Sequence, residues 1–356
     1  MHRKLFIPGP TEVHPDVRAA MATPPVGHRS EEATVVGERI IGRLQTLLHT
    51  NAPIFLSTSS STGLMEGVVL NGSAKRFLSV PCGAFGERWL DICRACGREV
   101  DVMPVEWGRA VRPEALREKL ASNRYDAVLL THNETSTGIL NPLPELAAVV
   151  REFDDVFLFV DAVSSMGAVD LDFDAMGLDG LLAGVQKALA APPGFAVMAV
   201  TPRAIDRARR VENRGFYFDF VRHFAAYEKR QGVTTPSTSH LFALDLQLER
   251  ILEETMPARE ARHRAMAERV RAWARERFAL YPEEGHQSTT LTCIRNTREV
   301  DIAALNRELA KRGVVIGNGY GKLKNQTFRI AHMGEIRLDE IEELLGWIDE
   351  ILGMKQ

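Results

Sequence analysis

Lys187 is the residue whose surroundings point most directly to covalent chemistry. It is the only charged residue between Asp179 and Arg203, and the residues around it are mostly apolar. Withdrawal from water disfavours the charged form of an amine, so we expect a lowered pKa and a nucleophilic side chain. A lysine that extends from a loop into solvent is the alternative that this position leaves open when it is considered alone.

Asp161 is the second candidate, because it directly follows the most apolar run of the sequence, residues 156–160. Ligands of open parallel sheets bind at the carboxyl ends of strands, where we expect this carboxylate. Considered alone, Asp161 is explained as well by a cap or turn of the next segment. Together with Lys187 it forms the minimal set for pyridoxal 5'-phosphate (PLP), in which an amine bonds the aldehyde as a Schiff base and an anion keeps the ring nitrogen protonated.

A run of hydroxyl side chains is suited to hold the phosphate of such a cofactor. Residues 57–62 are all Ser or Thr, and they lie between an expected strand at 54–56 and a helical segment that begins near Leu64. Hydroxyls, backbone N–H groups and a helix N-terminus together make an anion site, although an ordinary N-cap loop has the same composition. The sequence has no GxGxxG after a strand and no GxxxxGK[ST], so dinucleotide and P-loop sites are not indicated.

Arg329 is a candidate for binding the substrate. It stands in the apolar run 328–331 near the end of the chain. A guanidinium in such a place can form two parallel hydrogen bonds to a carboxylate. A salt bridge on an edge strand is the alternative.

Alternating helical and strand patterns must position these residues. Short apolar runs separated by helical segments predict an α/β fold with a mostly parallel sheet covered by helices on both faces. We expect a large domain over residues 1–245, which includes the N-terminal segment, and a small α+β domain over 246–356. The link between them is a long helical stretch from Leu241 to about Arg277, interrupted near Pro257. The expected strands of the large domain are 54–56, 77–80, 127–130, 156–160 and 195–200.

Composition excludes several classes of partner. The 356 residues include 44 basic and 47 acidic residues, and no long single-sign run suggests nucleic acid or a membrane surface. No apolar stretch approaches the roughly 20 residues of a membrane span, and the N-terminal apolar stretch is too short for a signal peptide. Four cysteines are too few for a disulfide framework and lack partners for a zinc site. We therefore expect a cytoplasmic enzyme without a metal.

These residues, in this order, resemble the class V aminotransferases of fold type I, and within them the alanine–glyoxylate and serine–pyruvate aminotransferase group. The resemblance spans nearly the whole chain, and its motifs are specific jointly. They are Pro8-Gly9-Pro10-Thr11, Gly83-Ala84-Phe85-Gly86-Glu87-Arg88, Thr131-His132-Asn133-Glu134-Thr135-Ser136-Thr137-Gly138, Val160-Asp161-Ala162-Val163-Ser164-Ser165, Gln186-Lys187 and Phe328-Arg329-Ile330.

The resemblance implies a role for each matching position. Lys187 and Asp161 are the catalytic pair, and Arg329 binds the substrate α-carboxylate. Phe85 and Val163 enclose the cofactor ring, and Ser136 approaches its phenolic oxygen. Ser60, Ser61 and Thr62, with Gln186, hold the phosphate, and Thr234 reaches the phosphate of a neighbouring subunit. The resemblance therefore also implies a homodimer with shared active sites.

The reaction implied is a ping-pong transfer of an amino group from alanine or serine to glyoxylate or pyruvate. Aspartate, phosphoserine or aminoethylphosphonate are alternative donors. Side-chain selection is expected from the loop that contains His28 and Arg29 and from the loop Tyr320 to Lys324.

Other reactions remain as rivals. A PLP-dependent cysteine desulfurase needs a mobile cysteine, whereas Cys293, the only cysteine of the small domain, stands on an apolar strand that looks like core. A non-catalytic binding module on the same fold is not supported, since the reactive residues are all present. A nicotinamide oxidoreductase lacks its glycine fingerprint.

Overall fold

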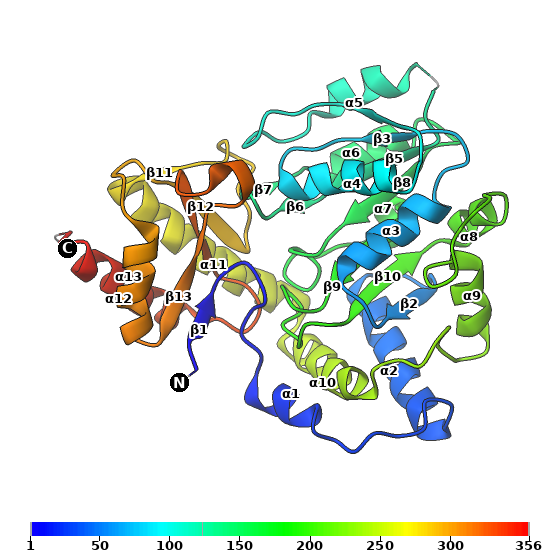
Figure 1. Cartoon of the computed structure of the whole chain (residues 1–356), viewed down its shortest axis with the longest axis horizontal. Helices are drawn as coiled ribbons and strands as arrows, with labels where there is room; N and C mark the ends of the chain where they lie inside the picture. The colour runs from blue at the N-terminus through cyan, green and yellow to red at the C-terminus, as the bar shows by residue number, and fades with distance from the viewer. Residues whose placement is uncertain (1, 123, 355–356) are drawn as a thin grey trace.

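The computed structural model describes residues 2–122 and 124–354. Figure 1 shows two sheets side by side, each with its own helices, and a chain that begins and ends near the smaller one. The larger sheet has seven strands, in the order β2 (Ile54–Ser57), β10 (Ala196–Val200), β9 (Gly180–Gly184), β8 (Phe157–Asp161), β5 (Ala127–Thr131), β3 (Phe77–Ser79) and β4 (Val100–Val102).

The larger sheet is parallel except at β10, which runs antiparallel to both β2 and β9. Strands β5, β8 and β9 are adjacent, so their carboxyl ends meet at one edge, where Thr131 pairs with Asp161 and Asp161 with Leu182. A two-stranded ribbon follows β5, formed by β6 (Asn133–Glu134) and β7 (Ile139–Leu140). The expected α/β fold with a mostly parallel sheet is confirmed.

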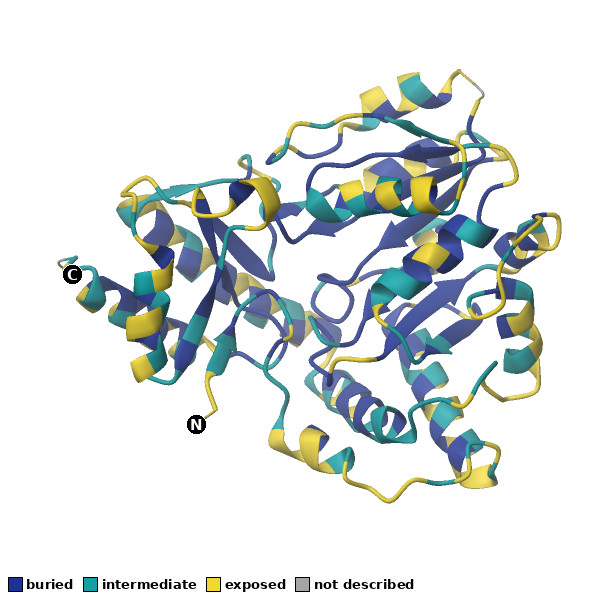
Figure 2. Ribbon diagram, viewed as in Figure 1, coloured by how far each residue is buried: buried dark blue, intermediate teal, exposed yellow. Residues whose placement is uncertain are grey.

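Both faces of the larger sheet are covered because side chains alternate along each strand. In β8, Phe157 and Phe159 pack into one apolar cluster, and Leu158 and Val160 pack into another. The first cluster is completed by α3 (Ser61–Asn71), α4 (Ala84–Ala95), α8 (Pro202–Ala208) and α9 (Phe220–Glu228). The second is completed by α2 (Glu31–Leu47), α5 (Pro113–Leu120), α6 (Leu143–Val150), α7 (Phe173–Met176) and α10 (Thr238–Glu254). Figure 2 shows these buried strands between helices whose outer faces are exposed.

The smaller sheet combines the two ends of the chain. Its order is β1 (Lys4–Phe6), β13 (Val314–Asn318), β14 (Thr327–Ala331), β12 (Leu291–Arg295) and β11 (Ala279–Leu280). It is accompanied by α11 (Met256–Arg277), α12 (Ile302–Lys311), α13 (Leu338–Ile351) and the 3₁₀ turn η1 (Gly321–Leu323), while α1 (Pro15–Ala20) lies against α10.

The N-terminal strand corrects one part of the expected domain division. We expected the N-terminal segment in the large domain, but β1 pairs in parallel with β13, and Phe6 is buried with Ile316 and Phe328. Three residues are too few to show a strand period, which is why the sequence did not reveal this pairing. The boundary near residue 245 remains a prediction, and it falls within α10.

The expected helical stretch from 241 to 277 is divided into α10 and α11. The break is at Thr255, which has a φ of 66° and whose hydroxyl accepts a hydrogen bond from the Ala258 N–H. Pro257 stands in the first turn of α11, where its missing N–H costs no hydrogen bond. The break therefore lies two residues before the proline that indicated it.

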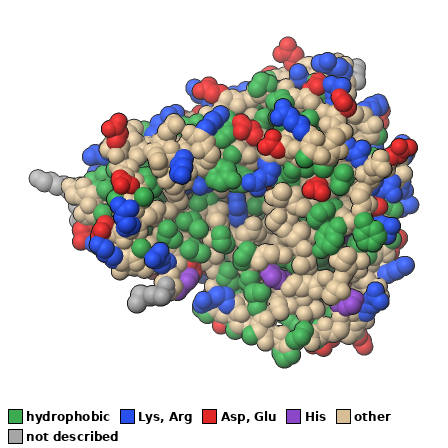
Figure 3. Space-filling model, in the orientation of Figure 1, with side chains coloured by type: hydrophobic (Ala, Val, Ile, Leu, Met, Phe, Trp, Pro, Cys, Tyr) green, Lys and Arg blue, Asp and Glu red, His purple; other side chains and the backbone are tan. Residues whose placement is uncertain are grey.

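The surface of the described residues carries both signs of charge. On the face shown in Figure 3, Lys and Arg side chains are interspersed with Asp and Glu side chains. No described helix is both long and apolar enough to cross a membrane. Within residues 2–122 and 124–354, no cluster of His, Cys, Asp and Glu is suited to hold a metal ion.

Candidate active site

A cavity of about 300 Å³ lies at the carboxyl ends of β8 and β9, and we call it the Lys187 cavity. Residues from both sheets line it. Asp161 ends β8 of the larger sheet, and Arg329 stands in β14 of the smaller sheet. Tyr320, just before η1, is a further lining residue. The sequence-predicted residues that the structure brings together here are Ser60, Ser61, Thr62, Phe85, Asp161, Val163, Gln186, Lys187 and Arg329.

Lys187 stands in the turn that follows β9, and two N-terminal residues fix this turn. Thr11 donates its N–H to Gln186 O at 3.0 Å and its hydroxyl to Lys187 O at 2.9 Å. Gly9 has a φ of 116°, and a Cβ there would stand 2.9 Å from Lys187 Cγ, so a larger residue would displace the lysine. Burial lowers the pKa of Lys187 to about 8, although the nearby carboxylate of Asp161 partly opposes this. Burial therefore favours the neutral, nucleophilic form of this amine.

Asp161 ends β8 and is buried. Its carboxylate accepts a hydrogen bond from the Val163 N–H at 2.9 Å, and no described cation forms an ion pair with it. Burial raises the pKa of Asp161 to about 6, against the lowering effects of that N–H and of Lys187. A buried carboxylate without an ion-pair partner fits a cationic ring nitrogen, which would supply the missing positive charge.

The hydroxyl run, residues 57–62, extends from the end of β2 into the first turn of α3, and Ser60 is the N-cap residue. The Gly63 N–H bonds Ser60 O at 2.9 Å, whereas no side chain of the described residues accepts a hydrogen bond from the N–H groups of Ser61 and Thr62, and the first turn of the helix holds no acidic residue. The nearby Gln186 side chain has a buried oxygen, Oε1, without a hydrogen-bond partner among the described residues. Free N–H groups, hydroxyls and the positive end of the helix dipole fit a phosphate.

Arg329 presents a guanidinium without a carboxylate partner. Its Nε donates to Asn318 O at 2.9 Å and its Nη1 to Thr135 O at 3.2 Å, and within the described residues it forms no ion pair. The strand that carries it, β14, is inside the sheet, so the alternative of an edge-strand salt bridge does not describe this arginine. An arginine that is 8% exposed and lines the cavity fits a carboxylate ligand.

Aromatic side chains form another wall of the Lys187 cavity. The Phe85 ring centroid lies 4.7 Å from Lys187 Nζ and 5.2 Å from the Tyr320 ring, which stacks on it. Arg88, one turn further along α4, lies over the same Phe85 ring and donates to Thr62 Oγ1 at 3.3 Å and to Tyr320 OH at 3.4 Å. The second arginine of the cavity therefore joins the hydroxyl run to the loop between β13 and η1.

Two expected cofactor contacts do not line the cavity. Ser136 is buried beneath it, where its hydroxyl donates to Glu134 Oε1 at 2.6 Å and accepts the Ala84 N–H at 3.0 Å. Thr234 lies outside the cavity, in the segment between α9 and α10. His28, expected to influence specificity, lines a different cavity.

Sequence reasoning missed three polar residues that position the site. Thr135 and Ser164 each accept a hydrogen bond from Lys187 Nζ. Glu134 accepts the N–H groups of Phe85 and Gly86 at 3.1 and 2.9 Å, which fixes the first turn of α4. All three stand within the family motifs, and this was the only signal in the sequence that marked them.

Cys293 is poorly placed for a nucleophile. It is fully buried on β12 and does not line the Lys187 cavity. Burial raises the pKa of its thiol to about 11, which keeps it protonated at neutral pH. The expectation that Cys293 is a core residue is confirmed, and this weighs against a desulfurase.

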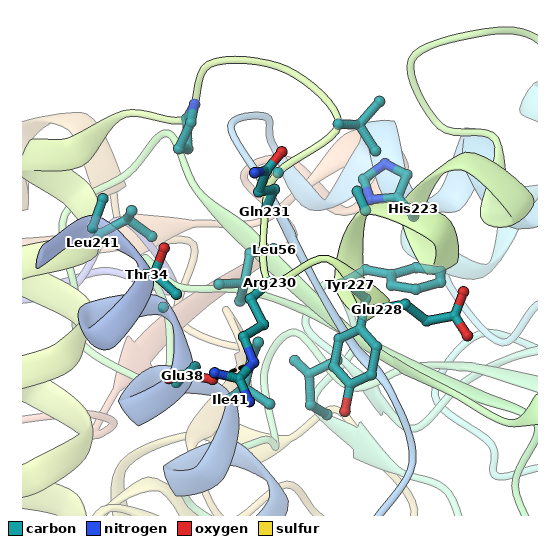
Figure 4. Close-up of a pocket in the computed structure, with 18 of the residues that line it drawn as sticks. Thr34, Glu38, Ile41, Leu56, His223, Tyr227, Glu228, Arg230, Gln231 and Leu241 are labelled. Atoms are coloured by element: carbon teal, nitrogen blue, oxygen red, sulfur yellow. Dashed lines mark ion pairs between the residues drawn. The ribbon is translucent and has the colours of Figure 1, made fainter. Parts of the chain in front are cut away.

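A further cavity lies between α2, α9 and the segment that leads to α10, and we call it the Glu38 cavity. Its volume is about 440 Å³. Figure 4 shows Arg230 extended towards Glu38, and the two form an ion pair at 3.0 Å. His28, Gln231 and Tyr227 are among the other residues that line it.

Comparisons with known proteins agree with this geometry. The sequence profile of the aminotransferase class-V family matches residues 54–338. An aminotransferase of Methanocaldococcus jannaschii is 36% identical over 93% of this chain and 87% of its own length. The L-aspartate–glyoxylate aminotransferase of Paracoccus denitrificans is 32% identical over 93% of this chain and 86% of its own length.

A solved structure extends the agreement to three dimensions. The alanine–glyoxylate aminotransferase of a Nostoc species superposes with a TM-score of 0.93 at 28% identity, over 99% of this chain and 96% of that one. The profile match, the identity and the shared fold together show that this chain belongs to the class-V aminotransferases of fold type I and is a transaminase.

Proposed function

We propose that the chain binds PLP in the Lys187 cavity and moves an amino group from alanine or serine to glyoxylate or pyruvate by a ping-pong mechanism. Two of the relatives described above carry glyoxylate aminotransferase in their names, which supports this acceptor. PLP would be held by the Lys187 amine, the Asp161 carboxylate, the Phe85 and Val163 side chains, and the start of α3.

The observation that carries the proposal is the placement of an amine and a buried carboxylate in one cavity, at the ends of β9 and β8. The pKa of Lys187 is lowered to about 8 and that of Asp161 is raised to about 6, both chiefly by burial. An amine that is readily neutral and an anion without a partner are the two groups that this cofactor requires.

The chain's own residues provide binding and proton transfer. The Arg329 guanidinium binds the α-carboxylate of the amino acid, which brings the Cα–H bond to the side of the cavity where Lys187 Nζ lies. The neutral Lys187 amine takes the Cα proton as a general base and later returns it at another carbon. When bound, PLP supplies an electron sink that weakens the Cα–H bond.

Arg88 favours a second candidate donor. It is a further guanidinium on the wall of the cavity, and no described carboxylate forms an ion pair with it. A second cation suits a donor with a side-chain carboxylate, such as aspartate. Phosphoserine and aminoethylphosphonate would place an anion at the same position.

We also propose a homodimer in which Thr234 reaches the phosphate held by the neighbouring subunit. Two features support this: Thr234 is away from the cavity of its own chain, and its neighbours Gln231, Gly232, Val233 and Pro236 line the Glu38 cavity at the surface. A cytoplasmic location remains a prediction from the sequence.

A half-reaction screen tests the proposal. The protein loaded with PLP should absorb near ~420 nm, and a true donor should remove that band in the absence of an acceptor. We expect alanine and serine to react fastest, with aspartate next if Arg88 binds its side chain. Loss of the band with phosphoserine alone would overturn the donor assignment, and a colourless protein would overturn the cofactor assignment.

A further inference from the structure

The Lys187 amine lies against a pair of hydroxyls to which the mechanism above gives no role. Its Nζ donates to Thr135 Oγ1 at 3.0 Å and to Ser164 Oγ at 3.1 Å. The two hydroxyl oxygens are 2.6 Å apart, so the three polar atoms form a closed triangle. Thr135 and Ser164 are 3% and 1% exposed, which shields this triangle from bulk water.

The backbone oxygens of both residues are held by other side chains. Thr135 O accepts a hydrogen bond from Arg329 Nη1 at 3.2 Å. Ser164 O accepts from Asn133 Nδ2 at 3.0 Å and from Thr290 Oγ1 at 2.9 Å. Apart from the hydrogen bond between them, the two hydroxyls bond only Lys187 Nζ among the described residues.

Charges of both signs face the amine from the surrounding elements. Asp161 on β8 and Glu134 on β6 raise the pKa of Lys187, while Arg329 on β14 and Arg88 on α4 lower it. Desolvation is the largest influence and favours the neutral amine. The two hydroxyls act in the opposite direction, because hydrogen bonds donated by an ammonium are stronger than those donated by a neutral amine.

We propose that Thr135 and Ser164 are further catalytic residues, whose hydroxyls accept the N–H bonds of the Lys187 ammonium and so stabilise the proton that it takes from the substrate. In this step the Cα–H bond breaks, the proton bonds to Nζ, and the electron pair remains with the substrate and the bound cofactor. The inference rests on the proposed function, because the proposed amino transfer is the reaction in which Lys187 takes and holds the Cα proton.

The test measures the ionisation of Lys187 in protein freed of PLP, so it does not depend on turnover. PLP is added over pH 6 to 10, and the rate at which the ~420 nm band appears is followed, since only the neutral amine can attack the aldehyde. We expect a midpoint near pH 8 for the unaltered chain. In Thr135→Val and in Ser164→Ala the midpoint should fall by about one pH unit, because each loses one acceptor for the ammonium.

Two control variants separate this role from a packing effect. Thr135→Ser keeps the hydroxyl and should keep the midpoint. Thr137→Val removes a buried hydroxyl close in sequence to Thr135. Among the described residues this hydroxyl has no hydrogen-bond partner, so it does not bond Lys187. This variant should also leave the midpoint unchanged. Circular dichroism verifies that each variant is folded.

The outcomes distinguish the inference from the proposed function. Midpoints that stay near 8 or rise in both Thr135→Val and Ser164→Ala would overturn the role of the hydroxyl pair. An unaltered chain that captures PLP at no pH would overturn the proposed function instead. If one of the two variants fails to fold, the other alone decides the question.

Discussion

The Lys187 cavity and the Glu38 cavity differ in what their charged residues face. The Glu38 cavity is the larger, at about 440 Å³ against about 300 Å³, yet its ion pair joins side chains that are 44% and 69% exposed. In the Lys187 cavity, a buried carboxylate and a buried guanidinium have no ion-pair partners among the described residues. Volume therefore does not single out the proposed reactive site, whereas buried charge without a partner does.

The difference has an energetic meaning. A solvent-exposed ion pair contributes little to stability in either direction. A buried charge without a partner destabilises the fold, so it persists where a ligand supplies the missing charge. Matched substitutions in the two cavities test this difference.

Lys187→Ala should have the largest effect on activity. Removing the amine removes both the attachment point of PLP and the general base, so the rate of amino transfer should fall by about 10⁴-fold or more. Steady-state assays with alanine and glyoxylate measure this loss. A variant that retains a tenth of the activity would contradict the assignment of Lys187.

Arg329→Lys should reduce kcat/KM for the amino donor by about 100-fold, because the two parallel hydrogen bonds of a guanidinium to a carboxylate cannot be formed by an ammonium. The matched change in the other cavity, Arg230→Lys, should alter kcat/KM by less than about twofold in the same assay. A larger effect of Arg230→Lys would show that the Glu38 cavity takes part in the reaction or in the assembly of the site.

Asp161→Asn should stabilise the protein freed of PLP while it weakens function. The folded-state pKa of Asp161 is raised to about 6 from an ordinary value of 3.8, so the fold favours the protonated form and stability is lost as pH rises through this window. At pH 7 the loss amounts to about 3 kcal/mol, and the neutral amide should restore it. Denaturant unfolding at pH 4 and pH 7 checks the prediction, since the gain should be about 3 kcal/mol at pH 7 and less than about 1 kcal/mol at pH 4.

Glu38→Gln is the matched control for this stability measurement and has the smallest expected effect. Because the Glu38 and Arg230 side chains are both largely in contact with water, the free energy of unfolding should change by less than about 1 kcal/mol. If Glu38→Gln were as stabilising as Asp161→Asn, a buried carboxylate without an ion-pair partner would not distinguish the two cavities.

The sequence predicted the elements that have a strong period or a long apolar run. The strand expected at 156–160 is β8, residues 157–161, and the strand expected at 127–130 is β5, residues 127–131. The short strands β1 and β4 were not predicted, because three residues carry too little pattern to separate a strand from a loop. Pairing of β1 with β13 depends on contacts between the two ends of the chain, which a local pattern does not contain.

The residues of the candidate site also differ in whether the sequence predicted them. The sequence marked Lys187 and Asp161 as candidates because a charge in an apolar run is conspicuous, and it marked residues 57–62 because a run of hydroxyls is unusual. Thr135 and Ser164 are ordinary polar residues in loops, and their contact with Lys187 arises because β5, β8 and β9 are neighbours in the sheet. Strand order is a property of the fold, so these contacts could not be derived from composition or spacing.

Reductive trapping of the cofactor tests the proposed bond between Lys187 and PLP. The protein loaded with PLP is reduced with borohydride, which fixes any bond between a lysine and the cofactor, then cleaved with trypsin and analysed by mass spectrometry. We expect a single modified peptide, which carries the added mass of reduced PLP on Lys187. Modification of a different lysine, or an unmodified Lys187 peptide from a yellow protein, would contradict it.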